Sequence, residues 1–236
     1  MKNFLQRWFT SKPQLNPQQI EQLASWRRLP EIDPTATFNH IRLVVVDVET
    51  TGLDLVTDTL ISIGAVAVVN GRIALSDNFS VVLQQRESSR KENILVHGIS
   101  GSVQREGIWP ADALLAFLEY LGKSPLVAFH VDFDETMIKR AMRQYLGLSF
   151  KHPWLDLAYV LPALYPDLMR RHHSLDDWAG YFDIRNDDRH NALADALATS
   201  QLLLVAIAQA RRSHQKKSYD GLRILERGFH LSRGNY

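Results

Sequence analysis

Two carboxylates stand at the end of an apolar run in the stretch Arg42–Gly52. Leu43 to Val46 are apolar and mostly β-branched, which predicts a strand buried on both faces. Asp47 and Glu49 are two residues apart, so on a strand they point to the same face. Two unpaired acids side by side in a core would be costly, so we expect a cation between them, most simply a divalent metal. The alternative is an exposed strand end with two solvated acids.

Further acids lie where a ligand could be held. Asp134 follows a predicted strand, residues 125–130, at the start of a helix, which is where α/β sheets place their ligands. Either Asp134 or Asp132 could instead cap that helix. Asp195 lies just over one turn into the last predicted helix, in an otherwise apolar segment, and is therefore paired, exposed or a ligand. Asp156 lacks an acidic companion, and we interpret it as a structural acid that pairs with nearby backbone or a base.

A histidine precedes the last predicted helix and could act with these acids. His190 lies in a polar loop, and from outside the helix its ring can swing over the same site as Asp195, although a lone loop histidine is usually solvated. Asp47, Glu49, Asp134 and Asp195 would bring about four negative charges to one pocket, which two Mg²⁺ or Mn²⁺ ions would neutralise. Such a pair of ions clamps the attacking and leaving oxygens of a phosphodiester. His190 would then be the base for the attacking water.

Composition limits the class of protein. The chain has 236 residues, is 45% hydrophobic and carries a net charge of +1, which is enough for one core with appendages and does not exclude a nucleic-acid partner. It has no cysteine, which excludes disulfides, thiol nucleophiles and zinc–thiolate sites and fits a reducing compartment. No apolar run reaches the roughly 18 residues of a membrane span, and the N-terminus lacks the core of a signal peptide. We therefore expect a cytoplasmic protein with no membrane span.

Three segments are predicted. Residues 1–39 form a helical N-terminal extension, with an amphipathic helix at residues 4–9 and a second helix that starts at Asn16. This extension either packs on the domain or docks on a partner or a membrane surface. Residues 40–212 form the main domain. Residues 213–236 form a basic C-terminal tail, a solvated or an ordered surface segment.

The main domain is predicted to be a mixed α/β domain. Three strands fall within residues 41–83, and Asn70-Gly71 is a hairpin turn between the second and third. Residues 84–106 are predicted to be irregular. The later elements, in order, are a helix at 111–121, a strand at 125–130, a helix at 135–146, a short strand at 154–156 that runs into a helix, a helix at 174–182 and a long helix at 191–211.

Three motifs together resemble a known family. Asp47-Val-Glu49-Thr-Thr-Gly52, Phe133-Asp134 and His190-x-Ala192-x-x-Asp195 look like the motifs of the DEDDh 3′–5′ exonucleases in order and separation. This is the superfamily of the proofreading epsilon subunit of bacterial DNA polymerase III, exonuclease X and RNase T. The resemblance covers about residues 42–209, and the three motifs together are specific where each alone is not. It implies a ribonuclease H-like sheet, with three antiparallel strands and then parallel ones, flanked by helices.

The resemblance also implies roles for individual residues. The metal-ligand positions fall on Asp47, Glu49, Asp134 and Asp195, and His190 takes the position of the general base. Contacts with the terminal nucleotide fall on Thr50, Gly52, Leu53, Glu92, His97 and Phe133. His130 stands where the family often has an asparagine that helps to hold the strand.

The implied function is metal-dependent hydrolysis of phosphodiesters from DNA 3′ ends, releasing nucleoside 5′-monophosphates in proofreading or repair. The expected partners are nucleic acid 3′ ends, single-stranded or frayed DNA, and a DNA polymerase or another replication or repair protein. A 3′–5′ exoribonuclease is the first alternative, because these motifs do not read the 2′-hydroxyl. Thr50 resembles the DNA-acting branch more than oligoribonuclease, which usually has Met there. The second alternative is a catalytically silent, nucleic-acid-binding subunit associated with a polymerase.

Overall fold

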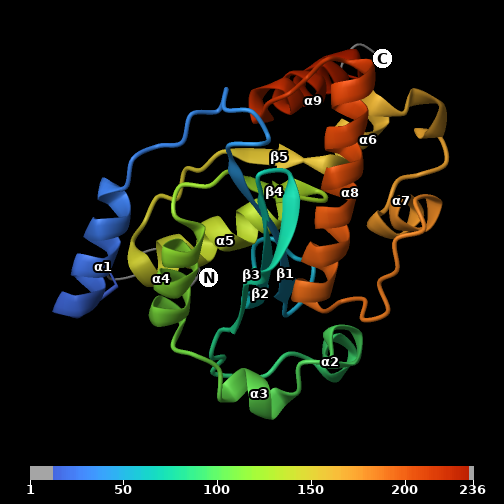
Figure 1. The fold of residues 1–236 in the computed structure, drawn as a ribbon. Coiled ribbons are helices and arrows are strands. Elements are labelled where there is room, and N and C mark those ends of the chain that lie inside the picture. The colour runs from blue at the N-terminus through green and yellow to red at the C-terminus, as the bar shows by residue number, and fades with distance from the viewer. Residues whose placement is uncertain (1–12, 234–236) are drawn as a thin grey trace, which may run out of the picture.

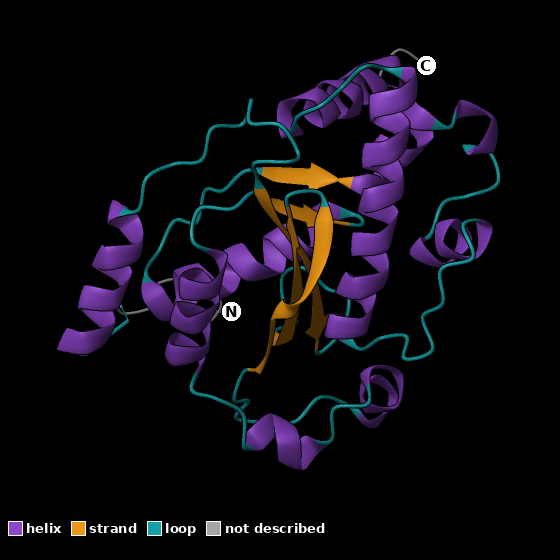
Figure 2. Ribbon diagram, in the orientation of Figure 1, coloured by secondary structure: helices purple, strands orange, loops and turns teal. Residues whose placement is uncertain are grey.

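The protein is a mixed sheet with helices on both faces (Figures 1 and 2). The computed structural model describes residues 13–233, so the amphipathic helix expected at residues 4–9 lies outside the described residues. The elements are α1 (Pro17–Arg28), β1 (Arg42–Thr50), β2 (Leu60–Val69), β3 (Arg72–Val82), α2 (Lys91–His97), α3 (Gly101–Arg105), α4 (Pro110–Leu121), β4 (Leu126–Ala128), α5 (Val131–Leu146), β5 (Trp154–Asp156), α6 (Leu157–Leu164), a 3₁₀ turn (Pro166–Leu168), α7 (Leu175–Tyr181), α8 (Ala192–Ser213) and α9 (Tyr219–Arg233).

The described residues form a five-stranded sheet in the order β3-β2-β1-β4-β5. β1, β2 and β3 pair antiparallel, whereas β4 and β5 continue the sheet in parallel from β1, as the sequence predicted. The predicted hairpin turn is confirmed, because Asn70 and Gly71 have positive φ angles of 53° and 75° between β2 and β3.

Each face of the sheet has its own hydrophobic core. Val44, Val46 and Val48 of β1 pack in the core that α1, α4 and α5 cover. Leu43 and Val45 point to the other face, into the core covered by α6, α7, α8 and α9. Because strand side chains alternate, the odd-numbered positions that follow on β1 face the α8 side as well.

α8 lies along this second face. It is long and apolar enough to cross a membrane by length and composition, although the sequence analysis found no continuous apolar run of that length. The two findings differ because a helix with a few scattered polar residues can have a high mean hydropathy without containing a continuous apolar run. In the structure α8 packs along β1 and β2, and Leu202, Leu203 and Ala206 are fully buried in the core. We therefore interpret α8 as a core helix.

The structure differs from the sequence prediction in two places. Residues 84–106, predicted to be irregular, contain the short helices α2 and α3, and Ser100 caps α3 by accepting a hydrogen bond from the Val103 N–H. α5 begins at Val131, four residues before the predicted start, because His130 adopts a left-handed conformation that ends the strand early.

Both terminal segments contact the domain. α1 begins after the capping residue Asn16, as predicted, and packs on α4, where Leu23 and Trp26 are buried. Residues 219–233, left open in the sequence as solvated or ordered, form α9. This helix packs on α6 and β5, and Tyr219 and Leu222 are buried.

Candidate active site

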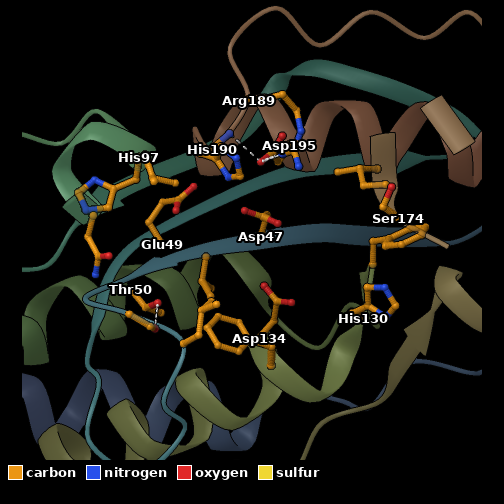
Figure 3. A pocket seen from close by; sticks show the side chains of 18 of the residues that line it. Asp47, Glu49, Thr50, His97, His130, Asp134, Ser174, Arg189, His190 and Asp195 are labelled. Carbon is orange, nitrogen blue, oxygen red and sulfur yellow. Dashed lines mark hydrogen bonds and ion pairs between the residues drawn. The ribbon is translucent and has the colours of Figure 1, made fainter. Parts of the chain in front are cut away.

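Carboxylates from three elements point into one cavity of about 640 Å³ (Figure 3). Asp47 and Glu49 come from β1, Asp134 from the first turn of α5 and Asp195 from the first turns of α8. Oxygens of Asp47, Glu49 and Asp195 lie within 4.8 Å of one another. Asp134 lines the same cavity outside that tightest group. The structure thus brings together the four acids that the sequence singled out.

A glycine that the sequence analysis did not consider brings α8 to the strand. Gly64 of β2 lies opposite Asp47 in the sheet register. A Cβ atom at Gly64 would lie 2.2 Å from backbone atoms of Ala192 and Leu193, so only glycine lets the first turn of α8 touch the sheet. This close approach places Asp195 beside Asp47. An isolated glycine inside an apolar strand was the available signal.

Burial and the neighbouring carboxylates raise the pKa of Asp47, Glu49 and Asp134. Burial, and then the neighbouring carboxylates, raise the pKa of Asp47 well above its ordinary value. Burial also raises the pKa of Glu49 to about 8; the charge of Asp195 adds to this shift and that of Arg189 opposes it. Burial is again the main cause of the raised pKa of Asp134. Full ionisation of the cluster would therefore place more negative charge in the cavity than the surrounding protein compensates.

These residues fit divalent cations. The donors are carboxylate oxygens from three different elements, without sulfur, and such a set suits Mg²⁺ or Mn²⁺. Burial together with nearby, unneutralised carboxylates raises the pKa of both Asp47 and Glu49, and bound cations would lower these pKa values again.

Asp195 accepts hydrogen bonds from three groups of the preceding loop. The Asn186 side-chain amide donates to Oδ1 at 2.5 Å, and the His190 backbone N–H donates to Oδ2 at 3.1 Å. The Arg189 guanidinium also donates to Oδ2 and bonds to Asp176 on α7, at 2.5 Å. Arg189 therefore ties α7 to α8 and lines the cavity. Arg189 was not singled out from the sequence, because its distance in space from Asp195 depends on how the loop folds.

His190 lines the cavity from outside the helix, as the sequence reasoning required. It has a positive φ of 64° and directly precedes Asn191, which caps α8 by accepting from two backbone N–H groups. This left-handed residue turns the chain so that the exposed ring points toward Glu49 and Asp195 (Figure 3). The ring can reach a ligand held by these acids.

Side-chain hydrogen bonds within the turn and the loop that follows stabilise the turn after β1. Thr50 Oγ1 donates to the Gly52 carbonyl at 2.6 Å, and Thr51 Oγ1 donates to Asp58 at 2.7 Å. A Cβ atom on Gly52 would lie 2.5 Å from the Asp58 carboxylate, so this glycine makes room for a neighbouring side chain. Leu53 follows at the rim of the cavity with 85% of its surface exposed.

Glu92 and His97, the two residues of α2 that we expected to contact a terminal nucleotide, differ in their positions relative to the cavity. His97 is buried and lines the cavity; its Nδ1 accepts from the Ile99 N–H at 3.0 Å, and its Nε2 lies 3.3 Å from Ser89 Oγ. Burial lowers its pKa, so the ring is neutral near pH 7. Glu92 is exposed on α2 and does not line the cavity. Its neighbour Asn93 does, and donates to the Thr51 carbonyl, which ties α2 to the turn after β1.

The segment between β4 and α5 completes the wall. Neither Asp132 nor Asp134 caps α5, because the cap position is His130. The His130 ring packs edge-on against Phe129, and its Nε2 lies 3.2 Å from the His173 carbonyl. Phe133, for which we expect contact with a terminal nucleotide, lines the cavity beside Asp134.

Residues 44–203 match the Exonuclease family. The chain belongs to the exonuclease family. The resemblance that the three motifs indicated is confirmed, and as a member of this family the chain is expected to be a nuclease, a hydrolase of nucleic acids.

Curated relatives are much longer than this exonuclease-family chain. The PolC-type DNA polymerase III of Thermotoga maritima is 31% identical over 169 residues, which is 72% of this chain and 12% of the relative. The corresponding protein of Bacillus subtilis is 32% identical over 168 residues, 71% of this chain and 11% of the relative. The chain therefore spans a small part of the length of these polymerases.

Solved structures share the fold. Exonuclease I of E. coli in complex with an oligonucleotide superposes with a TM-score of 0.62 at 16% identity, covering 75% of this chain and 43% of that one. Exonuclease X in complex with 5′ overhanging duplex DNA superposes with a TM-score of 0.57 at 19% identity, covering 76% and 99%. These likenesses confirm the predicted ribonuclease H-like α/β fold.

Proposed function

We propose that this chain is a divalent-metal-dependent 3′–5′ exonuclease that acts on DNA and releases nucleoside 5′-monophosphates, in proofreading or repair. The convergence of Asp47, Glu49, Asp134 and Asp195 on one cavity beside His190 is the observation that carries this proposal. DNA as the substrate is supported by the polymerase relatives and by the solved neighbours that hold an oligonucleotide or an overhanging duplex. A polymerase or another replication or repair protein is the proposed partner.

Each residue has a role in the proposed reaction. The four carboxylates would hold two Mg²⁺ or Mn²⁺ ions, which would neutralise the phosphate and favour attack by water. A nitrogen of His190 takes a proton from the attacking water as its oxygen bonds to phosphorus. The bond from phosphorus to the 3′ oxygen of the preceding nucleotide breaks, and that oxygen takes up a proton from solvent, which leaves a new 3′ hydroxyl and a nucleoside 5′-monophosphate.

The cavity walls would position the terminal nucleotide. The turn at Thr50 and Gly52, the exposed Leu53 and the neutral ring of His97 all line the cavity. Phe133 adds an apolar surface beside Asp134. Glu92 lies outside the cavity, and a role in substrate binding would require α2 to move.

The test is degradation of three 5′-labelled substrates, a 3′-mismatched DNA duplex, single-stranded DNA and matching RNA, with Mn²⁺ and with chelator. We expect a metal-dependent ladder on DNA that shortens from the 3′ end. Asp47→Asn should abolish it, whereas Asp167→Asn, the same change at an exposed acid of the 3₁₀ turn outside the cavity, should keep wild-type hydrolysis. A ladder on RNA alone would show an exoribonuclease. No ladder on any substrate would contradict the proposal and favour a silent subunit.

A further inference from the structure

The C-terminal helix α9 covers the free edge of the sheet beside the active site. β5 is an edge strand of three residues that pairs only with β4 among the strands of the described sheet. The Trp154 carbonyl accepts from Tyr219 Oη at 2.9 Å and from the Arg223 guanidinium. The Asp156 N–H donates to Glu226 Oε1 at 3.0 Å. Backbone groups that an edge strand would otherwise leave unpaired in the interior are thus satisfied by α9.

The side chain of Asp156 anchors the start of α5. Its Oδ1 accepts from the His130 N–H at 3.0 Å, and its Oδ2 accepts from the Val131 N–H at 2.9 Å. The first N–H groups of a helix have no partner within the helix, and His130 does not cap α5 with its side chain. Asp156, which we interpreted from the sequence as a structural acid that pairs with nearby backbone or a base, therefore supplies the cap from a neighbouring strand.

This anchor lies close to a proposed metal ligand. Asp134 is in the first turn of α5, three residues after Val131, and lines the cavity. A shift of Asp156 would move the start of α5 and the Asp134 carboxylate with it, because the first turn of a helix moves as a unit.

We propose that Glu226 is a positioning residue for Asp134. It holds the backbone of Asp156, and Asp156 in turn fixes the turn from which α5 starts. This inference rests on the proposed function, in which Asp134 holds a cation. The match to the Exonuclease family ends at residue 203, so Glu226 belongs to a segment beyond the matched region.

The burial of Glu226 supports a role in geometry. Only 9% of its surface is exposed, and its Oε2 lies 3.1 Å from Arg223 Nε. A buried ion pair adds little net stability compared with apolar residues of similar size, since desolvation offsets the attraction. The hydrogen bond that Glu226 Oε1 accepts from the Asp156 N–H is directional and fixes the position of the groups that it joins.

The test compares three variants of the full chain by residue-resolved amide hydrogen exchange without metal. Glu226→Ala removes the acceptor, and exchange at His130 and Val131 should rise about tenfold, as expected for the weakening of one buried hydrogen-bonded anchor. Glu226→Gln keeps an acceptor oxygen, and exchange should stay within about threefold of wild type. Arg227→Ala, which removes an exposed ion pair with Asp220 on the same helix, is the control and should leave both amides unchanged.

Calorimetry with Mn²⁺ gives a second readout. Glu226→Ala should raise the Kd about tenfold, Glu226→Gln much less, and Arg227→Ala not at all. Two results would overturn the proposal. In one, amide exchange at His130 and Val131 in Glu226→Ala rises only as much as exchange across the whole sheet. In the other, exchange at these two amides is the same in Glu226→Ala as in Arg227→Ala. If wild type binds no Mn²⁺, the proposed function fails, whereas the coupling through Asp156 is still decided by the exchange measurement.

Discussion

His190 and the acids it faces have separable tasks. The His190 ring points into the cavity, but only its backbone N–H bonds to Asp195. Replacing the side chain therefore leaves the hydrogen bond to Asp195 in place. The four carboxylates would be kept as ligands while the base is lost.

We predict that His190→Ala lowers kcat by about 10²–10⁴ and leaves the Kd for Mn²⁺ largely unchanged. Single-turnover hydrolysis and calorimetry on the same preparation measure the two quantities. His214→Ala, a histidine at the end of α8, is the control and should keep wild-type activity. Loss of metal binding in His190→Ala would show that His190 is a ligand.

The raised pKa of Glu49 predicts how stability depends on pH in chelator. In the folded, metal-free protein the pKa is about 8, against 4.5 as the ordinary value. The folded state thus binds more protons than the unfolded state between these values, so stability falls as pH rises through this window. Asp47 shifts in the same direction.

We expect the Tm in chelator to decrease from pH 5.5 to pH 8.5, and the slope to be smaller in Glu49→Gln, which does not titrate. Thermal denaturation followed by circular dichroism measures both. Glu21→Gln, at an exposed acid of α1, should keep the wild-type slope. An equal slope in Glu49→Gln and wild type would contradict the prediction.

At the scale of elements, the site depends on two close approaches. Gly64 lets α8 touch the sheet, and Arg140 of α5 holds the loop between β1 and β2. The Arg140 guanidinium donates to the carbonyls of Leu55, Val56 and Asp58 at 2.5, 2.7 and 2.9 Å. Helix and strand positions thus fix a loop that has little regular structure of its own.

We predict that Gly64→Ala destabilises the protein by about 1–3 kcal/mol, because the added methyl group overlaps the backbone of α8. Hydrolysis should fall more than tenfold, since Asp195 moves away from Asp47. Gly180→Ala, where a Cβ atom meets nothing within 4 Å, is the matched control. Urea denaturation and initial rates measure the effects, and wild-type values for Gly64→Ala would show that α8 shifts without consequence.

We predict that Arg140→Ala raises the KM for single-stranded DNA about tenfold with a smaller change in kcat. The rim residue Leu53 loses its fixed position, whereas the carboxylates stay in place. Lys139→Ala, which removes only a surface pair with Glu135, should behave as wild type. Steady-state kinetics separates the two constants, and a loss confined to kcat would place the effect at the acids.

At the scale of the whole molecule, the cluster of carboxylates lowers the stability of the metal-free protein and would provide the binding site for cations. Mn²⁺ at about 100 times its Kd should stabilise wild type by about 2.7 kcal/mol, by mass action. Asp47→Asn should raise the Tm in chelator, because it removes like-charge repulsion, and should lose most of the gain with Mn²⁺. Thermal melts with and without Mn²⁺ test this. A variant that keeps the full gain would show that Asp47 is not a ligand.

The local sequence determined the strands, most helices and the identity of the chemical groups. Alternation along β1 put Asp47 and Glu49 on one face, Asn70-Gly71 specified the hairpin, and Asn191 capped α8. These features depend on neighbouring residues, so spacing and residue type suffice to predict them. The shared cavity followed from the family motifs.

Tertiary structure alone decided which partners these groups meet. Three hydrogen-bonded contacts depend on how whole elements pack. They join Arg189 to Asp195, Asp156 to the start of α5, and Glu226 to Asp156. The same holds for Glu92. The family resemblance implied that it contacts the terminal nucleotide, but it is exposed on α2 outside the cavity. Contacts between distant segments carry no local periodicity, because the packing of the sheet and helices fixes them only when the chain has folded.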